Sequence, residues 1–291
     1  MKPKLKLRVE AIETDYWTPG DNYLEKIVEA VKGRVSDGNI IVISEKALAV
    51  AEGLLIDEAK IKPGLLASLI ARFWMRMVWG CFLGKICHLR WMNLMRLRNY
   101  PLREGAAHKE VALRYAGLLH ALMWGSEGGI DGSNLPYAYV SLPLTDPQRI
   151  AERIRWHMLN RLGRRVIVMI VDTDKTYSFC GFHFTHRPKP MRGIHSLFGF
   201  VAYVIGRVLR LRRRSTPLAL AGARMSIDLA LNIAEVANRA RGFGAGRTVW
   251  DMAERFGVDL TKVTWGMLKR VKHKPIVIVR ANIYPLKEKK K

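Results

Sequence analysis

The sequence predicts a protein of the α+β class, a mixed α/β fold of mixed sheets with packed helices. Hydrophobic residues make up 49% of the 291 positions, enough for a large buried core. Two short runs rich in β-branched residues, 39–44 (NIIVIS) and 166–171 (VIVMIV), predict strands that are buried on both faces. Long stretches with helical spacing, such as 148–162 and 226–241, predict the helices that cover them.

The first third of the chain predicts two strands, a helix and an unusual basic segment. Residues 5–14 alternate as a strand does, 21–33 have helical spacing, and a Ser-Asp-Gly turn precedes the strand at 39–44. Residues 65–98 combine tryptophans and methionines with arginines, which predicts one or two basic amphipathic helices. Two arginines near the middle of 65–83 would each cost roughly 2.5–3.5 kcal/mol in a bilayer, so we expect no membrane span and leave surface attachment open.

The remaining elements follow from helix-start signals and apolar runs. Asp146 and Pro147 begin a helix, because the aspartate accepts from free N–H groups and proline suits the first helical position. The strand at 166–171 is expected to end at Asp172 and to point into a loop. The other expected elements are a helix at 194–207, a strand at 218–221, a helix at 226–241, two short helices and a strand at 275–280.

The expected organisation is one domain, 1–286, followed by a Lys-rich tail, 287–291. Two segments, about 63–104 and about 242–272, are expected as helical insertions in that domain.

The cysteines Cys81, Cys87 and Cys180 form neither an even disulfide framework nor a Cys-x-x-Cys pair, which favours a reducing compartment. The N-terminal residues contain no apolar signal-peptide region, so we expect a cytoplasmic protein. Gln148 is the only glutamine, a compositional feature typical of heat-adapted proteins.

The net charge predicts affinity for polyanions. Lysine and arginine number 49 against 25 aspartates and glutamates, a formal charge of +24. Such a field attracts RNA, anionic membrane surfaces and phosphorylated substrates alike. The densest basic run is the candidate footprint for RNA or the ribosome, and its residues are Arg207, Arg210, Arg212, Arg213 and Arg214.

Two acidic segments have the residue types of a phosphate and metal site. Residues 128–134 (GGIDGSN) place a carboxylate, a hydroxyl and an amide within a glycine-rich loop, and 172–176 (DTDKT) follow the buried strand. Carboxylates beside hydroxyls suit Mg²⁺ or Mn²⁺, and loop glycines such as Gly129 let backbone N–H groups approach a phosphate. An ordinary turn remains the alternative interpretation of each segment.

In these same residues the chain resembles the coenzyme F-420 gamma-glutamyl ligase family. The resemblance runs from 37 to 53 (DGNIIVISEKALAVAEG), through 128–134 and 142–144 (LPL), to Asp172 and Thr173. It returns in the helix at 227–240 and in the closing strand KPIVIVR. The three motifs occur in matching order and spacing. The resemblance implies a fold of two interleaved subdomains and a homodimer.

The resemblance further implies an enzyme that uses GTP and divalent metal to join a substrate carboxylate to glutamate through an acyl phosphate. Nucleotide and a small carboxylate substrate would then be its ligands, with Asp131 and Asp172 as catalytic metal ligands. It also implies roles in holding nucleotide or phosphate for Lys46, Ser133, Asn134 and Thr173. The alternative is a repurposed, non-catalytic member that binds RNA or the ribosome.

Five positions depart from the family's usual motifs. Val50 and Leu54 stand where members commonly have a lysine and an arginine, and the residues after Thr173, which are usually a small residue, a glycine and an arginine, are here Asp174, Lys175 and Thr176. The fold prediction does not depend on these positions, because it rests on the strands and on the loop spacing.

Overall fold

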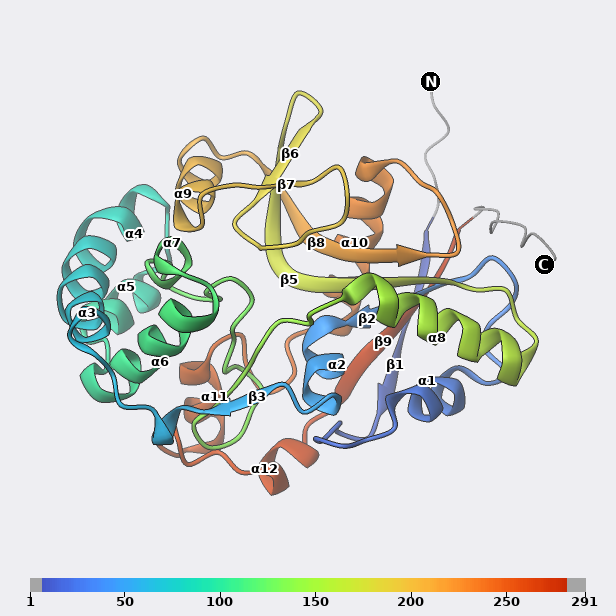
Figure 1. The fold of residues 1–291 in the computed structure, drawn as a ribbon, viewed down its shortest axis with the longest axis horizontal. Helices are drawn as coiled ribbons and strands as arrows, with labels where there is room; N and C mark the ends of the chain where they lie inside the picture. Colours follow the sequence, from blue (N-terminus) through green and yellow to red (C-terminus); the bar gives the residue numbers. More distant parts are fainter. Residues whose placement is uncertain (1–6, 282–291) are drawn as a thin grey trace.

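The computed structural model describes residues 7–281, and a seven-stranded mixed sheet forms its centre (Figure 1). The strand order is β1-β9-β2-β5-β6-β7, and β8 pairs with β5 off this path. β2 runs parallel to β5 and antiparallel to β9, while β5 and β8 are antiparallel. The strands are β1 Arg8–Thr14, β2 Ile40–Ser44, β5 Ile167–Phe179, β6 Phe182–Thr185, β7 His195–Ser196, β8 Arg212–Ala221 and β9 His273–Arg280. A small second sheet pairs β3, Leu55–Asp57, with β4, Tyr139–Ser141.

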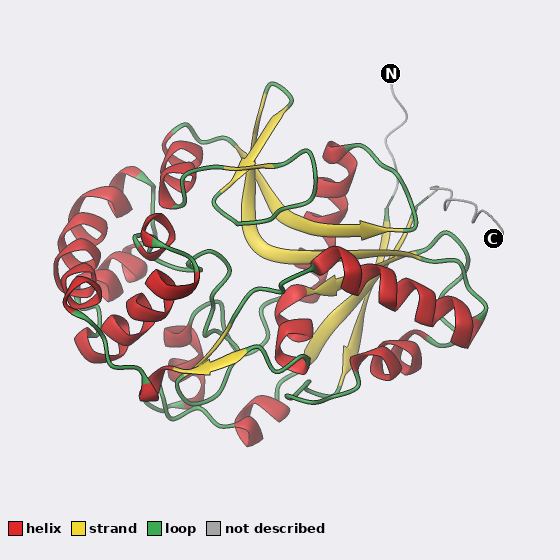
Figure 2. Cartoon of the chain, viewed as in Figure 1, coloured by secondary structure: helices red, strands yellow, loops and turns green. Residues whose placement is uncertain are grey.

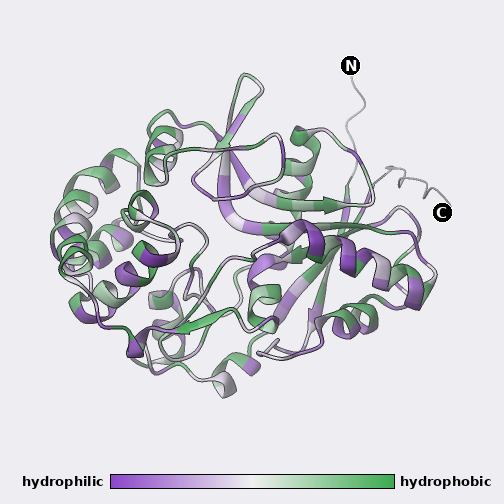
Figure 3. Cartoon of the chain, viewed as in Figure 1, coloured by the Kyte–Doolittle hydropathy of each residue, from purple (hydrophilic) through white to green (hydrophobic). Residues whose placement is uncertain are grey.

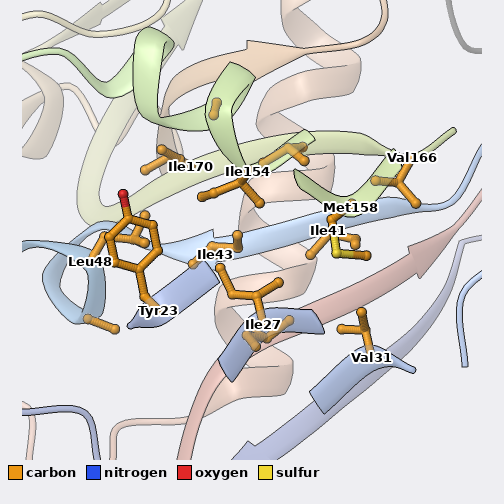
Figure 4. Close-up of a cluster of buried hydrophobic side chains, with 14 of the residues drawn as sticks. Tyr23, Ile27, Val31, Ile41, Ile43, Leu48, Ile154, Met158, Val166 and Ile170 are labelled. Atoms are coloured by element: carbon orange, nitrogen blue, oxygen red, sulfur yellow. The ribbon is translucent and has the colours of Figure 1, made fainter. Parts of the chain in front are cut away.

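Helices cover both faces of the central sheet. On one face α1 (Tyr23–Val31), α2 (Glu45–Ala51) and α8 (Pro147–Leu162) enclose an apolar cluster, part of which Figure 4 shows around Ile27, Ile41 and Ile154. On the other face α10 (Ile227–Arg241) packs its alanines and Ile233 against the sheet. The sheet is therefore buried on both sides, as its continuous β-branched runs predicted.

The start of α8 confirms the predicted helix signal. Asp146 Oδ1 accepts from the Arg149 backbone N–H at 3.0 Å, with Pro147 in the first helical position. The helix ends at Gly163, whose left-handed φ of 65° lets its N–H bond to the Leu159 carbonyl. Local residue choice alone thus sets both ends of this helix.

A helical lobe lies at the end of the molecule away from α1 and α8 (Figure 2). Trp79 and Met75 are fully buried in its core, and Trp79 meets Phe200 and Tyr203 edge to face. The segment 65–98 is helical as predicted. The helices of the lobe are α3 Leu65–Leu69, the π-helix η2 Ile70–Leu83, α4 Gly84–Ile86, α5 Trp91–Arg98, α6 Leu102–Tyr115, α7 Leu118–Ala121 and α9 Phe200–Val208, with the short 3-10 helix η1 Glu58–Lys60 at its entry.

The two short helices predicted after α10 are α11, Val249–Phe256, and α12, Trp265–Lys269. Arg96 on α5 donates to Asp251 at 2.7 Å and to Glu254 at 3.2 Å, both on α11. The two segments predicted as insertions, about 63–104 and 242–272, are therefore in direct contact.

The structure corrects the predicted end of the strand before Asp172. β5 continues through Asp172 to Phe179, because β6 and the first half of β8 supply hydrogen-bonding partners for the polar residues beyond it. The pairing of β5 with β8 is irregular between Asp172 and Lys175. Asp172 therefore lies at an interruption within a strand, a feature that changes the direction of side chains and is common at functional sites.

Two further element boundaries were also wrong. β8 begins at Arg212, six residues before the predicted strand, because Arg212, Arg213 and Arg214 pair with Ser178, Tyr177 and Thr176 of β5. The helix predicted at 194–207 begins only at Phe200, after the short strand β7. The Lys-rich tail, 287–291, lies outside the described residues.

Candidate active site

The first cluster of the candidate site is centred on Lys46, the second residue of α2. The Lys46 ammonium donates to the Ser133 carbonyl at 2.9 Å, to Ser133 Oγ at 2.7 Å and to the Asp131 carboxylate. Asp131 also accepts from the Ser133 backbone N–H at 2.7 Å. Three predicted site residues are therefore in direct contact. The side chains of Lys46 and Asp131 are each 24% exposed to solvent, so a ligand can reach this pair.

The second cluster is centred on Arg187, which is 2% exposed. Its Nε donates to Asp172 Oδ2 at 2.7 Å, Nη2 to Glu45 Oε1 at 2.5 Å and Nη1 to the Gly128 carbonyl at 2.6 Å. A β-carbon on Gly129, whose φ is +96°, would lie 2.3 Å from the Arg187 guanidinium carbon. Glycine is thus required at 129 by the close approach of Arg187 and by the backbone conformation.

The two carboxyl groups that contact Arg187 have pKa values shifted in opposite directions. Burial raises the pKa of Glu45 to about 7 against the attraction of Arg187, and the neighbouring Asp172 charge adds to this rise. Burial also opposes ionisation of Asp172, but Arg187, the Asp174 backbone N–H and Lys46 together hold the pKa of Asp172 below its usual range. Asp172 is therefore the ionised partner of Arg187, and Glu45 is the carboxyl that titrates near neutrality.

The two clusters adjoin at the start of α2. Glu45 and Lys46 are consecutive, and Glu45 contacts Arg187 while Lys46 contacts Asp131. The charge of Lys46 also acts on Asp172, and the loop 128–133 contacts both Arg187 and Lys46. Asp131 and Asp172, 41 residues apart in the chain, thus belong to one charged region.

A cavity of about 970 Å³ lies beside this region. Its wall includes Asp131, Gly132, Thr173 and Asp174 from the two acidic segments, but neither Lys46 nor Asp172. Aromatic side chains supply much of the rest, notably Tyr100, Trp124, Tyr137, Tyr139, Tyr203 and Trp250. Charged side chains also line it, among them Glu58, His108, Glu127 and Arg247, so the cavity is mixed in character. A concave site that combines apolar surface with convergent polar groups is the usual form of a small-molecule site.

The remaining predicted site residues have other contacts. Thr173 is exposed and its hydroxyl is 3.4 Å from Asp172 Oδ1. Asn134 turns away from Lys46, because its side chain accepts from the Ala245 N–H at 2.6 Å and donates to the Gly246 carbonyl at 2.9 Å. Asn134 therefore ties the loop to the segment before α11.

The positions that depart from the family motif lie in ordinary structural settings. Val50 is buried in α2 and Leu54 packs at the edge of the apolar core. Lys175 donates to Glu235 at 2.8 Å and to Ser215 Oγ at 3.0 Å. Lys175 is therefore paired within the protein although its side chain also borders the cavity.

The basic run is only partly available to a polyanion. Arg214 is 3% exposed and pairs with Asp228 at 2.8 Å, because its position in β8 buries its side chain. Arg207 donates to the carbonyls of Cys87 and His88 and is partly buried. Arg210, Arg212 and Arg213 are exposed.

The oxygen donors suit a metal that arrives with phosphate groups. Among residues 7–281, no group of three or more histidine, cysteine, aspartate or glutamate side chains is arranged to hold a metal ion. Asp131 and Asp172, with the Ser133 and Thr173 hydroxyls, nevertheless match the one or two carboxylates that Mg²⁺ takes when phosphates and water complete its shell. Both carboxylates are paired in this structure, Asp131 with Lys46 and Asp172 with Arg187, so each would have to release or share its partner.

Sequence reasoning missed three residues of this site: Arg187, Glu45 and Asp174. Asp174 accepts from Ser126 Oγ at 2.8 Å and lies 3.4 Å from His186 Nε2. Glu45 had a local signal, since it stands between a buried strand and Lys46. Arg187 had none, because its importance comes from partners 15 and 142 residues away.

Comparison with known proteins identifies a family for this chain. The family model for F420-0:Gamma-glutamyl ligase matches residues 11–195, which contain Lys46, Asp131, Asp172 and Arg187. An uncharacterized protein of Methanocaldococcus jannaschii is 32% identical in sequence, and the match covers 94% of this chain and 96% of the length of that protein.

Two proteins named Coenzyme F420:L-glutamate ligase are more distant relatives. The protein of Methanopyrus kandleri is 26% identical over 58% of this chain, and that of Archaeoglobus fulgidus is 29% identical over 53%. The matches span 60% and 55% of the lengths of these two ligases. Because the family model covers well over half of the sequence, the chain belongs to the F420-0:gamma-glutamyl ligase family.

Proposed function

We propose that this protein forms an amide between a substrate carboxylate and glutamate, using GTP and a divalent metal ion. The contact of Lys46 with Asp131 and Ser133, beside a large cavity with both aromatic and charged walls, is the observation that carries the proposal. In the reaction, a substrate carboxylate oxygen attacks the γ-phosphorus and GDP leaves. The glutamate amine then attacks the acyl carbon, and phosphate leaves as the C–N bond forms. The metal would neutralise charge on the transferred phosphoryl group.

Lys46 has the central role in this proposal. In the ligand-free protein its ammonium neutralises Asp131. When nucleotide binds, the Lys46 ammonium would leave the Asp131 carboxylate and pair with a phosphate oxygen instead. Asp131 would then be free to hold the metal. The exchange needs little rearrangement, because a lysine ammonium sits on a flexible stem and has three donors. Ser133 Oγ, 2.7 Å from Lys46 Nζ, is placed to donate to the same phosphate.

Arg187 has a positioning role and does not touch the reactants. It holds Asp172 ionised and fixes the Gly128 carbonyl, and so it sets the position of the loop that carries Asp131. In this proposal, the acceptor acid and glutamate bind in the cavity. Tyr100, Trp124 and Trp250 would contact the apolar part of the acceptor.

Titration calorimetry with GTP and Mn²⁺ tests the proposal. We expect Asp131→Asn and Lys46→Met each to weaken GTP binding at least about ten-fold, the loss of one charge-assisted contact. Asp15→Asn, the same chemical change at an exposed loop position, serves as control and should leave binding unchanged. If wild type binds GTP no better than the double variant Asp131→Ala, Asp172→Ala, the catalytic proposal fails.

Binding of RNA or the ribosome stays a second proposal, favoured by the exposure of Arg210, Arg212 and Arg213. Retention on ribosomal particles across a salt series tests it. Phosphate contacts make such binding fall steeply with salt, and Arg212→Glu with Arg213→Glu should weaken it at every salt concentration. Absence of retention at low salt would remove this proposal.

A further inference from the structure

The outer surface of the helical lobe carries a line of exposed apolar side chains. We call it the apolar stripe, and it consists of Leu65, Leu69, Phe73, Met77, Phe82 and Ile86. Phe73 is 52% and Phe82 68% exposed, values far above those of residues that help to form a core. The stripe runs the length of the continuous helical segment formed by α3, η2 and α4. Figure 3 colours these outermost helices largely as hydrophobic.

The helix geometry keeps the stripe on one side. Its members follow one another in steps of four or five residues. Residues 70–83 form a π-helix, in which hydrogen bonds join residues five apart, so a repeat of about four to five residues returns to the same side at each turn. The opposite side carries Ile70, Met75 and Trp79, which are buried in the core of the lobe. The stripe is therefore a second apolar face that the lobe does not use.

The segment that carries the stripe has charges of one sign only. Residues 59–103 contain nine lysines and arginines and no aspartate or glutamate. Arg76, Arg96 and Arg98 bond within the protein, to the Tyr100 carbonyl, to Asp251 and to the Gly80 carbonyl. The other six cations of this segment are exposed, and they are Lys60, Lys62, Arg72, Lys85, Arg90 and Arg103.

We propose that the apolar stripe docks this protein on the surface of an anionic lipid bilayer. Such a partner offers an apolar interior and a negative surface together, and basic amphipathic helices with exposed aromatics bind in this way. Trp91, 64% exposed at the start of α5, lies next in sequence to Arg90, an arrangement suited to the headgroup region. The stripe lies along the membrane and does not cross it.

Two other occupants fit less well. A second copy of the chain would bring two segments of the same high positive charge together, which is unfavourable without intervening anions. RNA would match the cations but leave the apolar stripe in water. By length and composition the helix Leu65–Ile86 could also cross a membrane, but a third of its most apolar window is buried within the lobe, so spanning would require the core around Trp79 to open.

Docking would also orient the cavity. Pro63, Tyr100 and Arg103, from the same basic segment, line its wall. A protein held by the stripe would therefore present the cavity to the bilayer in one fixed orientation. The inference concerns location alone, and it holds whether or not the proposed ligase reaction takes place.

Vesicle flotation tests the docking proposal with the full chain. We expect wild type to float with vesicles of phosphatidylglycerol and phosphatidylcholine, to release as salt rises, and not to float with phosphatidylcholine alone. Phe73→Ser with Phe82→Ser should weaken binding at least about ten-fold, because two exposed aromatic side chains no longer enter the bilayer. Arg72→Glu with Lys85→Glu should weaken it by a similar factor.

Matched controls carry the same substitutions elsewhere on the surface. Trp156→Ser with Phe179→Ser removes two exposed aromatics, and Lys32→Glu with Arg164→Glu reverses two exposed cations. Both controls should bind within about two-fold of wild type if docking is local to the stripe. Circular dichroism would verify that each variant is folded.

Three results would overturn the proposal. One is failure of wild type to float with anionic vesicles at low salt. Another is equal loss of binding in the stripe variant and its matched control, which would indicate adsorption by overall charge. The third is sedimentation showing that the stripe variant converts a dimer to a monomer, which would assign the stripe to a second copy of the chain.

Discussion

The Arg187 and Lys46 clusters meet at consecutive residues of α2 but differ in their access to water. Arg187 and Glu45 are nearly fully buried, whereas Lys46 and Asp131 each keep about a quarter of their side-chain exposure. A buried charge cannot lose its partner without a large desolvation penalty, while an exposed pair exchanges partners readily. The difference suggests a division of labour: Arg187 maintains the architecture of the site, and Lys46 is free to respond to a ligand.

Removing Arg187 should have the largest effect on stability. Arg187→Met leaves Asp172 charged and buried without a partner, which we expect to lower the free energy of unfolding by about 3–5 kcal/mol. Urea unfolding followed by circular dichroism measures this. Arg161→Met is the matched control, because Arg161 pairs with Glu25 at an exposed site and should contribute under about 1 kcal/mol. Equal losses in the two variants would contradict the structural role of Arg187.

The pH dependence of stability should identify Glu45. Its pKa is near 7 in the folded protein and 4.5 in a free side chain, so between these values the folded state binds more protons than the unfolded state. Stability from this group therefore falls as pH rises from 4.5 to 7. Glu45→Gln should remove that fall, a difference on the order of 1–3 kcal/mol between pH 4.5 and 7.5.

Thermal unfolding of wild type and Glu45→Gln at several pH values measures the effect. Glu29→Gln changes an exposed glutamate of α1 and should leave the pH dependence as in wild type. Parallel curves for wild type and Glu45→Gln would show that folding does not raise the pKa of Glu45, and would remove the assigned charge pattern.

The smallest stability change should come from Lys46. Lys46→Met separates a partly exposed ion pair, so we expect a loss of at most about 1 kcal/mol in urea unfolding. The same variant should lose nucleotide affinity, as proposed above. A loss of stability as large as that of Arg187→Met would erase the distinction between the two clusters.

Local patterns were sufficient for much of the sheet and its nearest helices. The run 39–44 predicted β2, and Asp146 with Pro147 predicted α8, because both signals lie within a few residues of the element that they define. The continuation of β5 beyond Asp172 was not predictable in this way. It depends on hydrogen bonds to β6 and β8, whose residues are distant in the chain.

The candidate site shows the same limit. GGIDGSN and Asp172 were visible through their residue types and positions, and Lys46 through the family resemblance. Arg187 is surrounded by residues that give no sign of its role, since Glu45 reaches it only after the sheet has formed. Long-range ion pairs leave no periodic trace in a sequence.

The position of β9 has a consequence for synthesis. This strand, residues 273–280, lies between β1 and β2 in the sheet and hydrogen-bonds to both. Strand β1 therefore has no neighbour in the sheet until nearly all of the described chain has left the ribosome. During translation, β1 and the open edge of β2 must be kept from pairing with other chains, a demand that favours chaperone assistance or rapid completion of the polypeptide.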